Sequence, residues 1–319
     1  DLINEVIIDS VCNQVFNITF YTGNNFGRTN GIGYFEANGS YWPFESGIML
    51  TSGSVNNAPG PEDETLSDGS FAWPGDLDLE NAIPGLFAGD TNNATIIEFD
   101  FIPVVDHMSF DFIFAAEEYG TFQCTFTDAF AFLLTDSNGV TTNLAIVPGT
   151  TDPISVLTVR DEAYNGGCPS VNPEYFDTFY GFNGANPLVS PTDYRGHTVP
   201  MTAEANVIPN ELYHIKLVIA DDGDTLFDSA VFLAAGSFDI GDIDLGEDIL
   251  LSSGNANCEG DEVILDAGEL PNNSSISWYM DGQLIDGANS TTLAVTSTAF
   301  YRAEIVINGT DCTFMDEIL

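Results

Sequence analysis

Four segments of the chain have the residue pattern of a strand, and acidic residues stand where these segments start or end. Side chains in a strand point alternately to the two faces of a sheet, so a carboxylate in phase with the apolar residues points toward the core. That phase is kept at the strand ends by Glu118, Asp128, Asp221 and Asp228. A buried carboxylate without a partner is costly, and a bound cation offsets that cost. The pattern therefore predicts a cation site built from strand ends.

Calcium is the cation that this site predicts, because it takes about six to eight oxygen ligands in adaptable geometry. Asp222 and Asp224, in the turn after Asp221, are candidate further ligands, and Glu117 is a weaker candidate because it has the outward phase. The turn is not an EF-hand, since Phe232 stands at the twelfth position counted from Asp221. The alternative interpretation is that these acids cap turns and face water.

The charge of the chain limits its partners. Its 319 residues include 49 Asp and Glu but only 5 Lys and Arg, for a formal net charge of -44. Such a surface repels nucleic acids and anionic lipids, both of which bind through clustered Lys and Arg, so we exclude nucleic-acid binding. No apolar run reaches the roughly 18 residues of a membrane span, and we expect no membrane insertion. The chain opens with an amphipathic segment and not with a signal peptide, which indicates a mature form.

Strand patterns dominate the chain. With 44% hydrophobic residues and 24 Phe, it is too apolar for a disordered acidic tail. Alternation recurs in residues 97–101, 108–114 and 213–219, whereas residues 129–134 and 229–235 are apolar on both faces, as in the middle of a sandwich. No segment shows a sustained helical period. We predict an all-β protein with a jelly-roll-like β-sandwich over residues 1–238. A long loop at residues 54–74 is a candidate binding loop, and the favoured alternative is a solvated or cation-ordered loop.

A second domain is predicted after an acidic linker at residues 239–248, which is either solvated or stiffened by calcium. Residues 249–319 contain several short strand patterns, with Trp278 on a central strand and Tyr301 near the start of a later one. This arrangement is typical of an immunoglobulin-like β-sandwich.

The five cysteines include no C-x-x-C pair, which favours disulfides over a structural zinc site and indicates an oxidising compartment. We pair Cys258 with Cys312 and Cys124 with Cys168, which leaves Cys12 as a thiol.

Several motifs together resemble the choice-of-anchor L domain: SGIMLTSG at 46–53, EFDFIP at 98–103, AEEY at 116–119, TDAFAF at 127–132, AIVPG at 145–149, HIKLVIAD at 214–221 and DSAVFL at 228–233. The resemblance covers roughly residues 1–238. It implies a secreted surface protein of the Bacteroidota, exported by the type IX secretion machinery and followed by immunoglobulin-like repeats.

We therefore expect an extracellular adhesion or surface-structure module with structural calcium, whose partner is a glycan, a surface protein or a neighbouring copy. A carbohydrate-binding module is the first alternative, with Trp42 and Trp73 stacking on sugars, although large aromatic residues more often pack in a core. A hydrolase is the least supported alternative. Glu117 and Glu118 are adjacent on a strand and point to opposite faces, so they do not flank one glycosidic bond.

Overall fold

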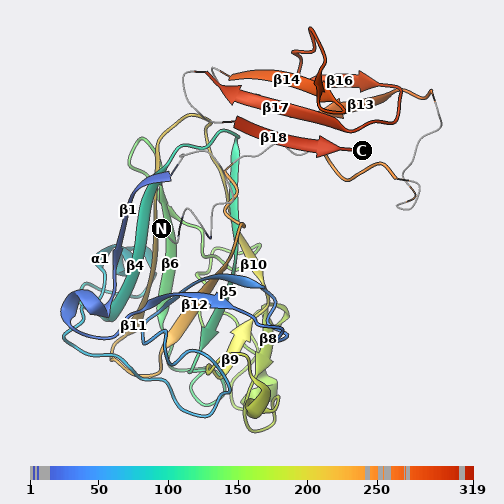
Figure 1. Cartoon of the computed structure of the whole chain (residues 1–319). Coiled ribbons are helices and arrows are strands. Elements are labelled where there is room, and N and C mark those ends of the chain that lie inside the picture. The colour runs from blue at the N-terminus through green and yellow to red at the C-terminus, as the bar shows by residue number, and fades with distance from the viewer. Residues whose placement is uncertain are drawn as a thin grey trace.

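The computed structural model describes residues 3, 6, 15–240, 245–250, 254, 260–268, 270, 274–308 and 313–319. Their strands form two bodies, a larger one within residues 15–234 and a smaller one within residues 263–318 that lies across one end of the first (Figure 1). All pairings between the named strands are antiparallel. The predicted all-β fold is confirmed.

The larger body is a sandwich of two sheets. The first sheet has the order β1 (Val15–Tyr21), β4 (Thr91–Phe101), β11 (Tyr213–Asp222), β6 (Ala129–Thr135) and β7 (Thr141–Asn143). The second has the order β2 (Ile32–Glu36), β3 (Ser46–Thr51), β12 (Ser229–Ala234), β5 (His107–Ala116), β9 (Gly196–Thr198) and β8 (Phe176–Phe179), and β10 (Met201–Asn206) also pairs with β5. The predicted central strands β6 and β12 lie inside their sheets, which explains why both of their faces are apolar.

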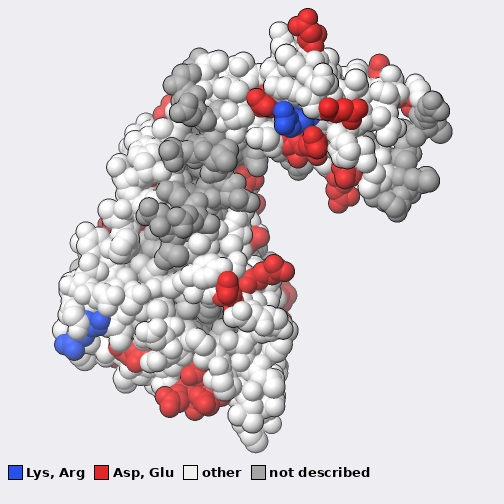
Figure 2. Space-filling model, in the orientation of Figure 1, with Lys and Arg blue, Asp and Glu red and all other residues white. Residues whose placement is uncertain are grey.

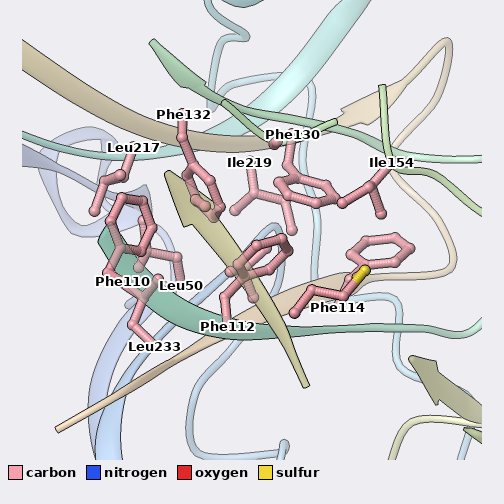
Figure 3. Packing of buried hydrophobic residues seen from close by; sticks show 14 of the residues in the cluster. Leu50, Phe110, Phe112, Phe114, Phe130, Phe132, Ile154, Leu217, Ile219 and Leu233 are labelled. Atoms are coloured by element: carbon pink, nitrogen blue, oxygen red, sulfur yellow. The ribbon is translucent and has the colours of Figure 1, made fainter. Parts of the chain in front are cut away.

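Aromatic side chains fill the space between the two sheets (Figure 3). Phe110 on β5 lies with its ring centroid 4.9 Å from that of Phe132 on β6, and Phe114 lies 4.9 Å from Phe130. These residues are the inward members of the predicted alternating patterns and are almost fully buried. Burial of each such side chain contributes about 1.5 to 3 kcal/mol to folding. This packing therefore holds the two sheets together and fixes where the ends of their strands meet.

Helical segments are short. The α-helix α1 (Leu77–Ala82) is capped by the side chain of Asp76, which accepts a hydrogen bond from the backbone of Leu79. Six residues are too few to show a helical period, and the sequence did not predict it. The 3-10 segments are η2 (Gly23–Phe26), η3 (Glu162–Tyr164), η4 (Pro173–Tyr175) and η5 (Pro187–Val189).

The smaller body contains two further sheets. One pairs β13 (Val263–Asp266) with β16 (Thr292–Val295), and the other has the order β15 (Gln283–Leu284), β14 (Ser274–Met280), β17 (Tyr301–Ile307) and β18 (Thr313–Ile318). Trp278 is fully buried at the centre of this body, and the hydroxyl of Tyr301 donates to the carbonyl of Ser297 at 3.0 Å. Both residues occupy the positions expected of them, while the immunoglobulin-like assignment stays a prediction.

The segment between the two bodies contributes one apolar side chain to the core of each. Ile240 packs into the core of the larger body, and Leu245 packs into that of the smaller one. The domain boundaries at 1–238, 239–248 and 249–319 stay predictions.

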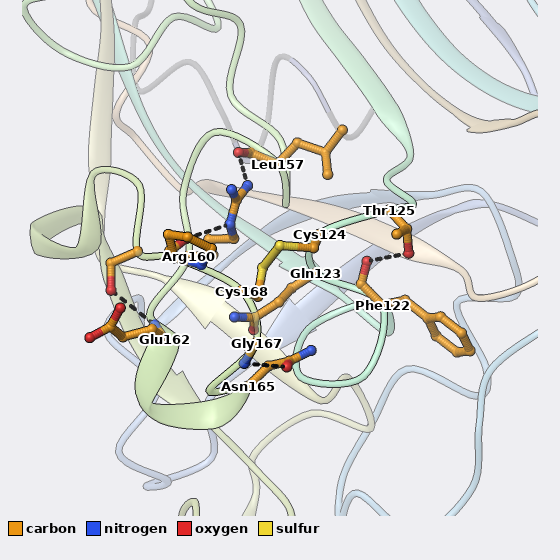
Figure 4. The surroundings of a disulfide bond; sticks show 12 residues. Phe122, Gln123, Cys124, Thr125, Leu157, Arg160, Glu162, Asn165, Gly167 and Cys168 are labelled. Carbon is orange, nitrogen blue, oxygen red and sulfur yellow. Dashed lines mark hydrogen bonds between the residues drawn. A yellow bond between two sulfur atoms is a disulfide. The ribbon is translucent and has the colours of Figure 1, made fainter.

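One disulfide links two long loops of the larger body. Cys124 and Cys168 are bonded with their Cα atoms 5.7 Å apart, which confirms that pairing. The bond ties the loop after β5 to the loop that precedes β8 (Figure 4). Cys12, Cys258 and Cys312 lie outside the described residues, so the second predicted pairing stays a prediction.

Candidate functional site

Four strand ends meet at one end of the larger sandwich. The last residue of β5, Ala116, is the Cα partner of Ser229 at the start of β12, and Ala220 on β11 is the partner of Ala129 at the start of β6. Ser52, just after β3, connects the two sheets because its hydroxyl lies 3.4 Å from Oδ2 of Asp128. The acidic residues that follow or precede these ends therefore gather in one place: Glu118, Asp128, Asp221 and Asp228. We call these four residues the acidic cluster.

The acidic cluster is buried, as strand phase predicted. Asp221 and Asp228 are fully buried, and Glu118 and Asp128 are each 3% exposed. Burial is the largest cause that raises the pKa of each of these carboxyls. Repulsion from other members of the cluster acts in the same direction on Glu118, Asp128 and Asp221, and the charge of Asp68 does so on Asp228. The pKa of Asp228 is raised to about 7. Ionised together, these side chains repel one another in a site that excludes water.

Neutral groups hold part of the acidic cluster in place. The Ser229 hydroxyl lies 3.4 Å from Oε2 of Glu118, and the backbone N–H of Asp222 donates to Oδ1 of Asp128 at 3.4 Å. The backbone N–H of Asp68 donates to Asp228 Oδ2 at 2.9 Å. These contacts are few for carboxylates that water does not reach.

Asp221 is the least satisfied member. Among the described residues, neither of its carboxylate oxygens has a hydrogen-bond partner. Burial and the charges of Asp128 and Asp228 raise the pKa of Asp221 well above its usual value, and the nearby Ser52 hydroxyl opposes them only partly. A buried carboxylate without a hydrogen bond costs its full desolvation free energy unless a ligand binds it.

Three oxygen atoms converge beside Gly69. The point where any other residue would carry its β-carbon lies 2.4 Å from Oδ1 of Asn93, 2.6 Å from the carbonyl oxygen of Thr225 and 2.9 Å from Oδ2 of Asp221. An amide oxygen, a backbone carbonyl and a carboxylate are the ligand types that calcium uses. Asn93 is fully buried and adopts a left-handed backbone conformation with a φ of 57°. The three oxygens approach the backbone this closely because residue 69 has no side chain.

The loop predicted at residues 54–74 covers this end of the sandwich. Besides the contact of Asp68 with Asp228, the carbonyl of Leu66 accepts a hydrogen bond from the backbone of Asp228 at 3.0 Å. The backbone of Ser70 donates to Oδ1 of Asn93 at 3.2 Å. The loop thus lies against the carboxylates, as the prediction of a cation-ordered loop requires.

Glu117 lies apart from the acidic cluster, on the other face of its strand. Its side chain is fully buried, and its Oε2 lies 3.2 Å from Nε of Arg195. Burial outweighs the attraction of Arg195 and raises the pKa of Glu117 to about 9. Arg195 also lies 3.6 Å from Glu62 and donates to the hydroxyl of Thr65 at 2.7 Å. The structure therefore gives Glu117 a basic partner of its own.

The two remaining predicted ligands lie at the surface of the site. Asp224 accepts a hydrogen bond from the backbone of Leu226 at 2.8 Å, as a turn cap does. Asp222 is half-buried, and burial raises its pKa. Within the described part of the chain, no group of three or more His, Cys, Asp and Glu side chains is arranged to hold a metal ion. A calcium site here has to include the neutral oxygens of Asn93 and Thr225.

Trp42 and Trp73 pack in the interior, the interpretation that the sequence favoured, and not against sugars as the carbohydrate-binding alternative required. Trp73 is fully buried and its indole N–H donates to the carbonyl of Ala94 at 2.8 Å. Trp42 is 7% exposed and packs edge-on against Phe232, with ring centroids 4.8 Å apart. Both rings are used in packing, so neither offers a face to a sugar.

Sequence reasoning missed the neutral members of the site: Ser52, Gly69, Asn93 and the carbonyl of Thr225. Ser52 and Asn93 give a weak signal, because each is a polar residue next to a run of apolar strand residues. Gly69 and Thr225 lie in loops whose course no local pattern determines.

Comparison with known proteins identifies the family to which the chain belongs. The family model of the choice-of-anchor L domain matches residues 1–239, so the chain belongs to the choice-of-anchor L family. No curated protein matches the chain. In the described part of the chain, no helix has the length and apolar character needed to cross a membrane.

Two solved structures show distant similarity. The adhesin domain of Epf from Streptococcus pyogenes is 9% identical over 70% of this chain and 72% of that one, with a TM-score of 0.21. A beta-1,2-glucanase from Parabacteroides distasonis is 10% identical over 98% of this chain, which spans only 38% of the glucanase, with a TM-score of 0.22. At these scores neither similarity supports a statement about function.

Proposed function

We propose that this chain is a secreted cell-surface adhesion or surface-structure module whose larger sandwich is completed by a structural calcium ion. Membership of the choice-of-anchor L family supports the surface role. A strongly acidic composition supports calcium, because calcium offsets the repulsion between carboxylates that burial brings together.

The fully buried carboxylate of Asp221, with neither oxygen partnered among the described residues, is the observation that carries the calcium proposal. Asp221 holds the ion together with Oδ1 of Asn93 and the carbonyl of Thr225, which approach the same space beside Gly69. Bound there, calcium offsets two of the negative charges of the acidic cluster and fastens the 54–74 loop to the strand ends. Its role is structural, since it would stabilise the end of the sandwich.

The calcium proposal is tested by thermal unfolding of the whole chain in calcium and in EDTA. We expect calcium to raise the melting temperature of the native protein by several degrees, because a ligand that binds only the folded state stabilises it. Asp221→Asn should abolish most of that increase. Asp152→Asn, which changes an exposed aspartate away from the site, is the matched control and should keep the full increase. Equal melting curves in calcium and EDTA, with no bound metal found by elemental analysis, would reject calcium.

The adhesion proposal needs a separate measurement. Beads coated with the chain are passed over surfaces coated with gelatin, with cellulose or with the chain itself, in calcium and then in EDTA. We expect attachment to the protein-coated surface that is lost in EDTA. Attachment to cellulose alone would favour the carbohydrate-binding alternative, and attachment to the chain-coated surface alone would indicate assembly between copies. Absence of attachment to all three would count against adhesion.

One observation favours a carbohydrate-binding module as the second candidate. An open groove of about 550 Å³ is lined by Arg195, Glu62 and Asn165 and by the rings of Tyr164 and Phe182. Phe182 is 89% exposed, so its ring is free to stack on a sugar. Binding to a glycan that is lost in Phe182→Ala but kept in Phe87→Ala would support this candidate; Phe87 is another highly exposed phenylalanine, away from the groove.

A further inference from the structure

The acidic cluster has an enclosed side and an open side. Asp221 and Asp228 lie on the enclosed side, against the 54–74 loop. On the open side, a cavity of about 180 Å³ is lined by the carboxylates of Glu118 and Asp128 and, nearer the solvent, by those of Asp222 and Asp224. We call this cavity the acidic pocket. A ligand that enters it meets four carboxylates.

The mouth of the acidic pocket is apolar. It is formed by Phe122, Phe126, Leu226 and Phe227, of which Phe126 is 56% and Leu226 50% exposed. The ring of Phe122 lies 4.9 Å from Phe227 and 5.7 Å from Phe126, so the rings form a continuous wall. Exposing such side chains to water is unfavourable, and a bare metal ion at the floor of the pocket needs no apolar wall around its entrance. The lining suits a ligand that is apolar along its length and positive at its tip.

One residue of this wall has a strained backbone conformation. Phe227 has a φ of 64°, in the left-handed region that a bulky residue rarely adopts. The conformation is maintained because its backbone N–H donates to the Ser67 hydroxyl at 3.0 Å and the next residue, Asp228, is bonded to Leu66. On the opposite side, the Cys124–Cys168 disulfide anchors the loop that carries Phe122 and Phe126 (Figure 4). Both halves of the wall are therefore fixed before a ligand arrives.

The chain itself does not fill the acidic pocket with a cation. In the part of the chain that the structure describes, the ion pairs of Arg195, Lys216 and Arg302 involve other carboxylates, and none involves Glu118 or Asp128. One calcium ion on the enclosed side carries two positive charges, fewer than the six carboxyl groups of the acidic cluster, Asp222 and Asp224 taken together. Carboxyl groups without a cation therefore remain at the floor of the pocket, on Glu118 and Asp128.

From this arrangement, the geometry points to the acidic pocket as the docking site for a lysine or arginine side chain of a partner surface protein. The aliphatic stem lies along Phe126 and Leu226, and the cationic head reaches Glu118 and Asp128, where charge-assisted hydrogen bonds are strong. Phe122 and Phe227 add cation–π attraction. The acidic surface, on which Figure 2 shows basic side chains in only two places on the visible face, steers a basic partner toward the chain. The inference rests on the proposed adhesion role and gives it a partner class.

The test uses short soluble peptides with a single central lysine, arginine or acetyl-lysine, titrated into the whole chain in calcium at physiological ionic strength. Acetyl-lysine keeps the stem and removes the charge, so we expect it to bind about tenfold or more weakly than lysine. Phe126→Ala should weaken binding of the lysine peptide severalfold, while Phe87→Ala, the matched exposed control, leaves it unchanged.

Three results would overturn the docking site: equal binding of the lysine and acetyl-lysine peptides, equal effects of Phe126→Ala and Phe87→Ala, or loss of lysine binding at saturating calcium. The last result would show that a second calcium ion occupies the acidic pocket. Phe126 is not a calcium ligand, so Phe126→Ala keeps the calcium-dependent rise in melting temperature. Failure of the docking site is therefore distinguishable from failure of the calcium proposal.

Discussion

The carboxylate of Asp221 lies so close to the backbone of Gly69 that a β-carbon at residue 69 would be 2.9 Å from its Oδ2. The same β-carbon would be 2.4 Å from Oδ1 of Asn93. Two segments far apart in the sequence, a loop and the end of β11, are thus in contact through a residue without a side chain. A side chain at residue 69 would overlap both oxygens.

Gly69→Ala should therefore destabilise the protein and remove its response to calcium. Overpacking in a closed space costs about 1 to 3 kcal/mol, and the added methyl group occupies the position toward which the three oxygens point. Denaturant unfolding in calcium and in EDTA measures both effects. Gly166→Ala is the control because a β-carbon there meets no atom within 4 Å, and it should change neither quantity. A full calcium response in Gly69→Ala would show that the ion binds elsewhere.

When calcium is removed, the folded protein should become more stable as the pH falls from about 9. Burial raises the pKa of Glu117 in the folded protein from the ordinary 4.5 to about 9, and that of Asp228 from 3.8 to about 7. A carboxyl with a raised folded pKa binds its proton more tightly in the folded state, so the free energy of unfolding rises as the pH falls from about 9 toward these lower values. Melting curves in EDTA between about pH 9 and pH 5 should show this increase.

Glu117→Gln separates the two contributions. The variant lacks the titrating group of Glu117, so the increase should become smaller over the whole range from about pH 9 down to 4.5, while the part due to Asp228, which begins near pH 7, is kept. Stability in EDTA that falls steadily with decreasing pH over this range would contradict the assignment.

The strands that place these groups were predictable from the sequence, because residues such as Phe110, Phe112 and Phe114 alternate with polar neighbours and a sandwich buries one face of each strand. The same phase predicted that Glu118, Asp128, Asp221 and Asp228 are buried. The neutral ligands were not predictable, since the approach of Thr225 and Gly69 depends on loops folded over the strand ends. Sugar stacking by Trp42 and Trp73 stayed an alternative to packing because their loop-rich surroundings in the sequence do not show which side of the loops faces the interior.

Glu80 should respond to pH in the opposite direction from Glu117. Burial acts to raise its pKa, but its carboxylate accepts hydrogen bonds from the backbone of Gly89 at 2.8 Å, the backbone of Thr91 at 2.9 Å and the hydroxyl of Thr91 at 2.7 Å. These hydrogen bonds lower the pKa below its ordinary value of 4.5. A lowered folded pKa stabilises the fold above the unfolded value, and the contribution is lost as the pH falls through the folded pKa.

Glu80→Gln should accordingly cost about 1 to 3 kcal/mol at neutral pH, because an amide replaces a charged acceptor of three hydrogen bonds. The difference from the native protein should shrink on acidification below about pH 4.5. Denaturant unfolding at neutral and acidic pH measures both values. Asp152→Asn, an exposed control, should show neither effect; a constant difference at all pH values would mean that shape and not charge is responsible.

Removal of the Cys124–Cys168 disulfide should loosen the wall of the acidic pocket as well as the fold. The two cysteines are 44 residues apart, and closing a loop of that length stabilises by about 4 kcal/mol in the chain-entropy model. In the double variant Cys124→Ser and Cys168→Ser, we expect a lower melting temperature and weaker binding of the lysine peptide, because Phe122 and Phe126 are no longer held in position. A reducing agent should lower the melting temperature of the native protein further than that of the variant. Unchanged peptide binding in a folded variant would show that the wall is held by its own packing.

Asn93 combines a conformational and a ligating role, and two substitutions separate them. Its φ of 57° disfavours alanine, whereas glycine adopts that conformation readily. Its side chain also accepts from the backbone of Ser70 at 3.2 Å and donates to the carbonyl of Ser70 at 2.8 Å. Asn93→Gly relieves the backbone but removes the amide, so we expect the 54–74 loop to detach and thermolysin to cleave it near Phe71 faster than in the native protein, with calcium no longer protecting it. Asn93→Ala adds backbone strain to the same loss and should be less stable than Asn93→Gly. If Asn93→Gly keeps calcium-dependent protection of the loop, Asn93 serves the fold alone and the ion is held by Asp221 without it.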